Sequence, residues 1–127
     1  MNTLPDIYRD YLECLNRQAW NELQFFVAEE VCYNDQEIGL TGYLSMLKQN
    51  YQDIPDLYFE AELVVSDSSY LACRLMFNCT PVGTFMGLPV NGRKIRFSEN
   101  VFYEFRNHKI SRVWSVIDKA TIEQQLY

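Results

Sequence analysis

The sequence predicts an α+β protein in which N-terminal helices cover one face of a curved, mostly antiparallel sheet. In the first half of the chain, apolar residues recur three or four positions apart, as on one face of a helix. From about Leu57 they alternate with polar residues, as in strands that bury one face. Clusters of turn residues separate the alternating runs, and no repeat or low-complexity linker interrupts them.

Two helical segments are expected before the first strand. Pro5 suits the first turn of a helix, and the apolar residues after it share one face: Ile7, Tyr8, Tyr11, Leu12 and Leu15. A second helix is expected over 19–30, where one stripe carries Trp20, Leu23 and Val27. The run VCYND then predicts a short strand that ends near Asp35.

A third helix and the sheet follow. Thr41 is expected to cap the helix, and the cluster Asp53-Ile54-Pro55-Asp56 ends it. The strands are expected over 57–65, 70–79, 94–105 and 110–117. Turns are expected at 66–69, 91–92 and 106–109. A short helix, KATIEQQL, completes the predicted elements.

Composition limits the possible functions. The 127 residues, 48% of them hydrophobic, suit one domain over residues 1–127 with a substantial core. The net charge of −6 and the lack of a Lys or Arg run argue against nucleic acid as a partner. No apolar run approaches the ~20 residues that span a bilayer, so no membrane is expected. His108 is the only histidine, and no C-x-x-C spacing occurs, so neither a metal nor an organic cofactor is predicted.

The cysteines and the first residues of the chain indicate a compartment. Cys14, Cys32, Cys73 and Cys79 form no paired motif, and MNTLPDIYRD has no apolar signal core. These features predict a cytoplasmic, reduced protein. The first three cysteines lie in apolar segments, where we expect them to serve as inert packing.

Motifs in the second half of the chain are more specific. Residues 80–95 read TPVGTFMGLPVNGRKI, and FSENVFYEF and KISRVWSVID follow them. Upstream, IPDLYF and YND fit the same pattern. With these motifs, nearly the whole chain resembles the SnoaL-like polyketide cyclases of the nuclear-transport-factor-2-like superfamily.

The resemblance implies a cone of helices and sheet around a largely apolar cavity, and usually a homodimer. In the cyclases it also implies an acid/base Asp beside the Trp of the last strand, in a pattern like His-Trp-Asp. Here those positions are Val113, Trp114 and Ser115. The family's threonine-histidine before the G-x-F segment corresponds to Thr80-Pro81. The chain therefore departs from the family at the polar positions on which cyclase chemistry depends.

Glu99 is the first candidate for an acid/base role. It shares a strand face with Phe97 and Val101, where a carboxylate is desolvated and its pKa should rise. Such a group could take or give a proton near neutral pH. The alternatives are a position at an interface or an ion pair with one of three arginines: Arg74, Arg96 or Arg112.

The strand register decides what faces Glu99. The family's hairpin favours a bulged turn at 106–109, which would place Glu99 opposite Ser115 and Val101 opposite Val113. A two-residue turn would instead bring Glu99 diagonal to Asp118, because a slip of one residue exchanges the faces of a strand.

Asp35 is the second candidate. It follows the first predicted strand, where related ketosteroid isomerases carry their general base. Their oxyanion acid corresponds to Val101 here, so half of that machinery is absent. The alternative is a loop carboxylate that is solvated or caps a turn. Asp118 precedes the last helix and is expected to cap it.

An aromatic, tyrosine-lined cavity is expected to bind a flat, mostly apolar or aromatic molecule with a few oxygens. Its lining would come from the helices, from the segment that in the family leans over the cavity mouth, and from the last strands. The predicted residues are Tyr11, Trp20, Tyr43, Phe85, Met86, Leu88, Val101, Val113 and Ser115. Each of them fits plain core packing as well.

Two functions remain open at this point. The first is a metal-free enzyme that performs enolisation, aldol-type or isomerisation chemistry on an apolar carbonyl compound, with Glu99 as acid/base. The second is a non-catalytic ligand-binding or dimerisation module that has lost the cyclase residues. In either case a partner subunit is expected on the polar face of the last two long strands, around Phe102. The other residues of that face are Arg96, Ser98, Asn100 and Ser111 or Ser115.

Overall fold

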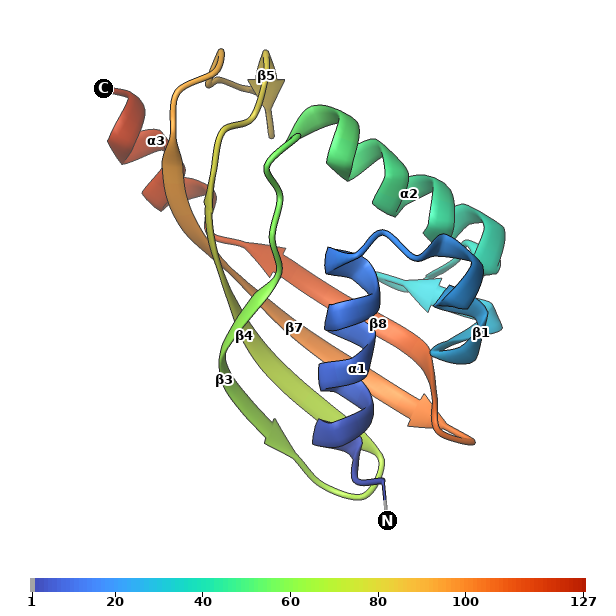
Figure 1. The fold of residues 1–127 in the computed structure, drawn as a ribbon. Coiled ribbons are helices and arrows are strands. Elements are labelled where there is room, and N and C mark those ends of the chain that lie inside the picture. The colour runs from blue at the N-terminus through green and yellow to red at the C-terminus, as the bar shows by residue number, and fades with distance from the viewer. Residues whose placement is uncertain (1) are drawn as a thin grey trace.

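The computed structural model describes residues 2–127, in which helices cover one face of a six-stranded sheet. Helices α1 (Leu4–Asn16) and α2 (Gly39–Asp53) lie over the same face (Figure 1). A 3₁₀ helix, η1 (Trp20–Phe25), connects α1 to the first strand, and α3 (Lys119–Leu126) follows the last one. The α+β architecture predicted from the sequence is confirmed.

The main sheet has the strand order β2-β1-β8-β7-β4-β3. Its strands are β1 (Val27–Tyr33), β2 (Gln36–Glu37), β3 (Glu60–Ser66), β4 (Tyr70–Cys79), β7 (Ile95–Arg106) and β8 (Lys109–Ile117). All neighbouring strands are antiparallel except β1 and β8, which are parallel. A separate hairpin consists of β5 (Thr84–Phe85) and β6 (Leu88–Pro89).

The start of α1 follows from its sequence, whereas the start of α2 does not. The Thr3 hydroxyl accepts from the Asp6 N–H, and the Asp6 carboxylate accepts from the Thr3 N–H, which is a capping box. The predicted cap of α2 at Thr41 is wrong, because that helix already begins at Gly39 and has no side-chain cap. Gly39 has a φ of +69°, and an added Cβ would lie 3.3 Å from the carbonyl oxygen of Glu29, so a glycine turns the chain here.

The second predicted helix is wrong in its latter half. Residues 19–30 contain η1 and then the first part of β1, so Val27 belongs to a strand. Val27 and Val31 are both buried, and their spacing of four residues resembles a helix face. A strand also places residues four positions apart on the same face, so this spacing does not distinguish the two structures.

The core lies between the helices and the concave face of the sheet. Alternate residues of β4 and β7 are buried there, among them Phe77 and Phe97, whose rings stack with centroids 5.2 Å apart. Helix α3 packs against β7 at the opposite end from its hairpin, and it covers Ser98. This arrangement places the inner side chains of β7 and β8 beneath α1 and α2.

Candidate functional site

A cavity of about 270 Å³ opens between the end of α2 and the inner face of the sheet. Aromatic and aliphatic side chains dominate its wall, and three polar side chains interrupt them. The lining residues are Tyr33, Met46, Asn50, Ile54, Leu57, Phe59, Phe77, Phe85, Phe97, Glu99 and Ile117. Glu99 is the only ionisable carboxyl group among them.

Glu99 meets a hydroxyl group instead of a cation. The Ser115 hydroxyl donates a hydrogen bond to Glu99 Oε2. Burial raises the pKa of Glu99 above its ordinary value, and the bond from Ser115 lowers it by a smaller amount. Within residues 2–127, no lysine or arginine forms an ion pair with this carboxylate. None of the three arginines considered as partners therefore pairs with Glu99, and two of them pair elsewhere: Arg74 with Glu62 and Arg112 with Glu104.

The predicted strand register is wrong by two residues, although the predicted face is right. Glu99 lies opposite Ile117, and Val101 lies opposite Ser115. The hairpin is a two-residue turn at Asn107-His108, where both residues have positive φ. The pairing of β7 with β8 is irregular between Glu104 and Phe105. Beyond this irregularity, the inward residues of β8, such as Ser115, lie opposite inward residues of β7, such as Val101. Ser115 therefore reaches Glu99 diagonally across the strands.

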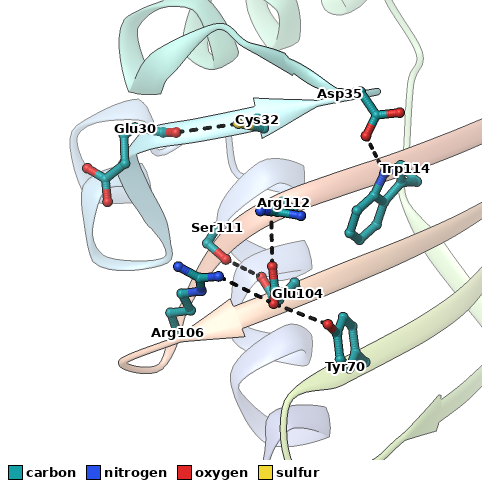
Figure 2. Close-up of polar contacts among 9 residues, drawn as sticks. All are labelled: Glu30, Cys32, Asp35, Tyr70, Glu104, Arg106, Ser111, Arg112 and Trp114. Carbon is teal, nitrogen blue, oxygen red and sulfur yellow. Dashed lines mark hydrogen bonds and ion pairs between the residues drawn. The ribbon is translucent and has the colours of Figure 1, made fainter.

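Asp35 does not reach the cavity. It is exposed in the turn between β1 and β2, with a φ of +69°. Its carboxylate accepts a hydrogen bond of 3.0 Å from the indole N–H of Trp114, whose side chain lies on the outer face of the sheet (Figure 2). The turn interpretation of Asp35 fits this geometry, and the general-base interpretation does not.

Phe85 is the member of the predicted ligand set that lines this cavity. Its ring lies 5.6 Å from that of Phe97, centroid to centroid. Ser115 touches Glu99 without lining the wall. Met86, in contrast, occupies the turn of the β5–β6 hairpin and is 38% exposed.

The remaining predicted ligand residues lie in the core instead of on the cavity wall. The hydroxyl groups of Tyr11 and Tyr43 are hydrogen-bonded to each other at 2.7 Å. The ring of Trp20 packs edge-on against Tyr51. Three further residues are buried: Leu88, Val101 and Val113. The phenol groups of Tyr11 and Tyr43 therefore lie in the core, where they bond to each other and do not line the cavity.

Sequence reasoning missed most of the wall. Met46 and Asn50 lie four residues apart on α2, and Tyr33 ends β1. Asn50 carried a usable signal, because it is a polar residue on the same side of the helix as Leu47 and Ile54. Tyr33 carried none, because its position depends on the irregular pairing of β1 with β8.

Other sequence predictions concern side chains outside the cavity. Asp118 caps α3 as predicted, since its carboxylate accepts from the backbone N–H and the hydroxyl of Thr121. The cap lowers the pKa of Asp118. His108 is exposed in the hairpin turn. Over residues 2–127, no group of three or more His, Cys, Asp or Glu side chains is arranged to hold a metal ion. In the same residues, no helix is long and apolar enough to cross a membrane.

The fold and the cavity define a cone-shaped α+β protein that encloses a small apolar site with one carboxyl group. The SnoaL-like polyketide cyclase family matches residues 5–126, so the chain belongs to this family. No curated protein matches it.

Solved structures agree with this assignment. A SnoaL-like polyketide cyclase from Agrobacterium tumefaciens is 56% identical, with a TM-score of 0.99 and full coverage of both chains. IdmH from Streptomyces antibioticus is 19% identical, with a TM-score of 0.84, and the match covers 98% of this chain and 99% of that one. AclR from Streptomyces galilaeus is 18% identical, with a TM-score of 0.78 and coverage of 97% and 94%. At such low identity the likeness to the two Streptomyces proteins is evidence for the fold alone.

Proposed function

We propose that this protein catalyses proton transfer at a carbon next to the carbonyl group of an apolar ring compound, without a metal. The reaction class is the enolisation that underlies aldol-type cyclisation and isomerisation. One observation carries the proposal: the Glu99 carboxyl group faces an aromatic cavity and has a serine hydroxyl, but no cation, as its partner.

The chemistry follows from the state of this group. A carboxyl group with a raised pKa is a stronger base when ionised than an exposed one, and its protonated form persists closer to neutral pH. Phe77 and Phe97 can hold a flat ring, which fixes the acidic C–H bond near the carboxylate. Glu99 would remove the proton, and the same group would return it to the same or to another carbon.

Deuterium exchange tests this proposal directly. 2-Tetralone is a two-ring ketone whose C–H groups beside the carbonyl exchange with D₂O, and NMR follows the loss of their proton signals. We expect the protein to accelerate the exchange, and Glu99→Gln to reduce the acceleration by about a hundredfold or more. Equal rates for the wild type and the variant would contradict a catalytic role for Glu99.

A binding role without chemistry is the second candidate. It is favoured by Val113 and Ser115, which stand where the family carries polar catalytic residues. This alternative expects 2-tetralone to bind and to raise the melting temperature, as any ligand of the folded state does, without faster exchange. Glu99→Gln would then alter affinity alone.

We further propose that the protein forms a homodimer through the outer face of the sheet. Four apolar side chains are exposed there, on β3, β7 and β8: Leu63, Val65, Phe102 and Val116. An apolar patch that crosses several strands is typical of an interface. Two residues of the predicted surface do not belong to it, because Ser98 is buried and Ser115 points inward to Glu99.

Sedimentation of matched variants tests the dimer. Phe102 is 57% exposed on this face, and Phe25 is 63% exposed in η1. Phe102→Glu should give a monomer at micromolar concentration, while Phe25→Glu should sediment like the wild type. A monomeric wild type would contradict the proposal.

We place the protein in the cytoplasm, in keeping with four unpaired cysteines, three of them buried.

A further inference from the structure

The cavity offers Glu99 as an acceptor, yet a carbonyl substrate also needs a donor. When a proton leaves the neighbouring carbon, negative charge develops on the carbonyl oxygen, and a fixed hydrogen-bond donor at that point is often the largest contribution to catalysis. Besides Glu99, the polar side chains on the cavity wall are Tyr33 and Asn50. Either could supply the donor, and their surroundings distinguish them.

Tyr33 lies at the Glu99 end of the cavity. It pairs with Val113 across the parallel β1–β8 ladder, and Ser115 follows on the same face of β8. Ser115 donates to Glu99. Both of these side chains affect the pKa of the Tyr33 phenol, so the three groups lie close together at this end of the cavity. Asn50 comes from α2, and within residues 2–127 its side chain has no hydrogen bond to Ser115 or Glu99.

The turn that follows Tyr33 is hydrogen-bonded to β8 through both the backbone and the side chain of Asn34. The Asn34 N–H donates to the Val113 carbonyl at 2.8 Å, and the Asn34 side chain accepts from the Ser115 N–H at 2.9 Å. Asp35 adds its bond from Trp114 on the outer face (Figure 2). These bonds hold a turn whose two residues both have positive φ, a conformation that Asn and Asp tolerate best. The phenol of Tyr33 is thus held beside the carboxylate.

Tyr33 is protonated at neutral pH. Burial raises its pKa above the ordinary value, the nearby Ser115 hydroxyl lowers it by less, and the negative charge of Glu99 raises it again. A protonated phenol is a donor, and a ligand oxygen in the cavity can accept from it.

The size of the cavity limits what can bind between these groups. Its volume of about 270 Å³ lies just below the range of roughly 300–1,000 Å³ that accommodates drug-sized ligands. The rings of Phe59, Phe77 and Phe97 lie next to one another along its wall. One or two fused rings fit such a space, and a large multi-ring product does not.

We propose that Tyr33 donates a hydrogen bond to the carbonyl oxygen of a one-ring or two-ring ketone while Glu99 removes a proton from the adjacent carbon. This inference rests on the proposed function and adds a second residue to its site. In the step, the C–H bond breaks and the proton forms an O–H bond with Glu99. The electron pair of the C–H bond forms the C=C bond of the enolate, and the carbonyl π pair moves onto the oxygen. Tyr33 keeps its proton.

The experiment compares two Tyr→Phe variants, each of which lacks one phenol hydroxyl, in the exchange assay. Tyr33→Phe removes the proposed donor, and Tyr8→Phe removes a buried phenol that bonds to Tyr103 at 3.1 Å, outside the cavity wall. We expect Tyr33→Phe to lower kcat for exchange of 2-tetralone by about a hundredfold. Tyr8→Phe should keep the wild-type rate. Tetralin, which has the same rings without the oxygen, should bind wild type and Tyr33→Phe with equal affinity.

The outcomes separate the inference from the proposed function. If Glu99→Gln is slow and Tyr33→Phe is as fast as the wild type, Tyr33 is not the donor, and Glu99 keeps its role. If wild type and Glu99→Gln exchange at the same rate, the proposed function fails and the inference fails with it. A slow Tyr33→Phe with wild-type tetralin affinity and an unchanged pH–rate profile supports the donor role. Equal losses for tetralone exchange and tetralin affinity would contradict it and indicate a packing role.

A measurement on the wild type keeps the inference testable if Tyr33→Phe does not fold. The carbonyl stretch of bound 2-tetralone, recorded by isotope-edited infrared spectroscopy, reports on hydrogen bonding to the oxygen. We expect a lower frequency than in hexane. A frequency equal to that in hexane would overturn the proposal.

Discussion

Two glutamates on the same strand, Glu99 and Glu104, show how differently one residue type can be used. Both belong to β7, five positions apart, so they lie on opposite faces of the sheet. Glu104 is 13% exposed on the outer face and is surrounded by Tyr70, Arg106 and Arg112 (Figure 2). Glu99 lies on the inner face beside Ser115 and a cavity.

The difference lies in what compensates the charge. Arg112 Nε lies 3.3 Å and Arg106 Nη2 3.8 Å from the carboxylate of Glu104, and the Tyr70 hydroxyl donates to it at 3.2 Å. Contacts of a carboxylate with such partners stabilise the fold. Glu99 has a hydroxyl partner only, so its ionised form is disfavoured. We infer that Glu104 stabilises the fold and that Glu99 takes part in the proposed reaction.

The largest expected effect separates the two glutamates by activity. Glu104→Gln should keep the wild-type rate of 2-tetralone exchange, whereas Glu99→Gln should lose about a hundredfold or more. The two substitutions are chemically identical and lie on the same strand. Similar losses in both variants would mean that the assay reports the integrity of the sheet, and the distinction between the two faces would be wrong.

The free energy of unfolding should fall in Glu104→Gln and not in Glu99→Gln. Glu104→Gln replaces a carboxylate that faces two guanidinium groups, and we expect it to lower the free energy of unfolding by about 1–2 kcal/mol at pH 7. Glu99→Gln should not lower it, because the amide has no charge to desolvate. Urea denaturation of both variants measures the difference. A loss in Glu99→Gln as large as in Glu104→Gln would indicate an undetected partner for Glu99.

Asp118 is a third carboxylate, and it serves as a control with a purely structural role. Asp118 caps α3 through two bonds to Thr121, and Asp118→Ala should lower the free energy of unfolding. Its exchange activity should equal that of the wild type. Thermal melts followed by circular dichroism measure the first effect, and loss of exchange activity would show that α3 also shapes the cavity.

The pH dependence of stability gives the smallest expected effect. The pKa of Glu99 is raised above 4.5 in the folded state, so the folded protein holds that proton more tightly than the unfolded chain. Stability from this group is therefore complete below its unfolded pKa and is lost as pH rises through the folded pKa. Relative to the wild type, Glu99→Gln should gain stability as the pH rises above the ordinary glutamate value of 4.5. A stability difference that does not change with pH would contradict the raised pKa.

The elements that sequence patterns predicted best are those with sharp ends. The strand over 70–79 and the helix over 119–126 match β4 and α3 residue for residue, because turn residues and Asp118 mark their limits. The start of β1 was taken for helix, because Val27 follows Trp20 and Leu23 at helical spacing. Alternation along a strand fixes which residues share a face, and it does not fix which residue lies opposite.

For the same reason the candidate site was predicted only in part. Glu99 and Phe85 could be assigned to the cavity from the strand pattern and the family motifs. The Ser115 contact needed the hairpin irregularity, and Tyr33 needed the β1–β8 pairing. Both depend on contacts between segments distant in the sequence, which local periodicity does not encode.

The central claim is that Glu99 holds its proton to a higher pH than an ordinary glutamate. Side-chain carboxyl NMR of ¹³C-labelled protein, with the Glu99 signal assigned by its absence in Glu99→Gln, measures this titration directly. We expect a midpoint above the ordinary value of 4.5. A midpoint at or below 4.5 would mean that the carboxylate is solvated or paired, and it would contradict the role assigned to Glu99.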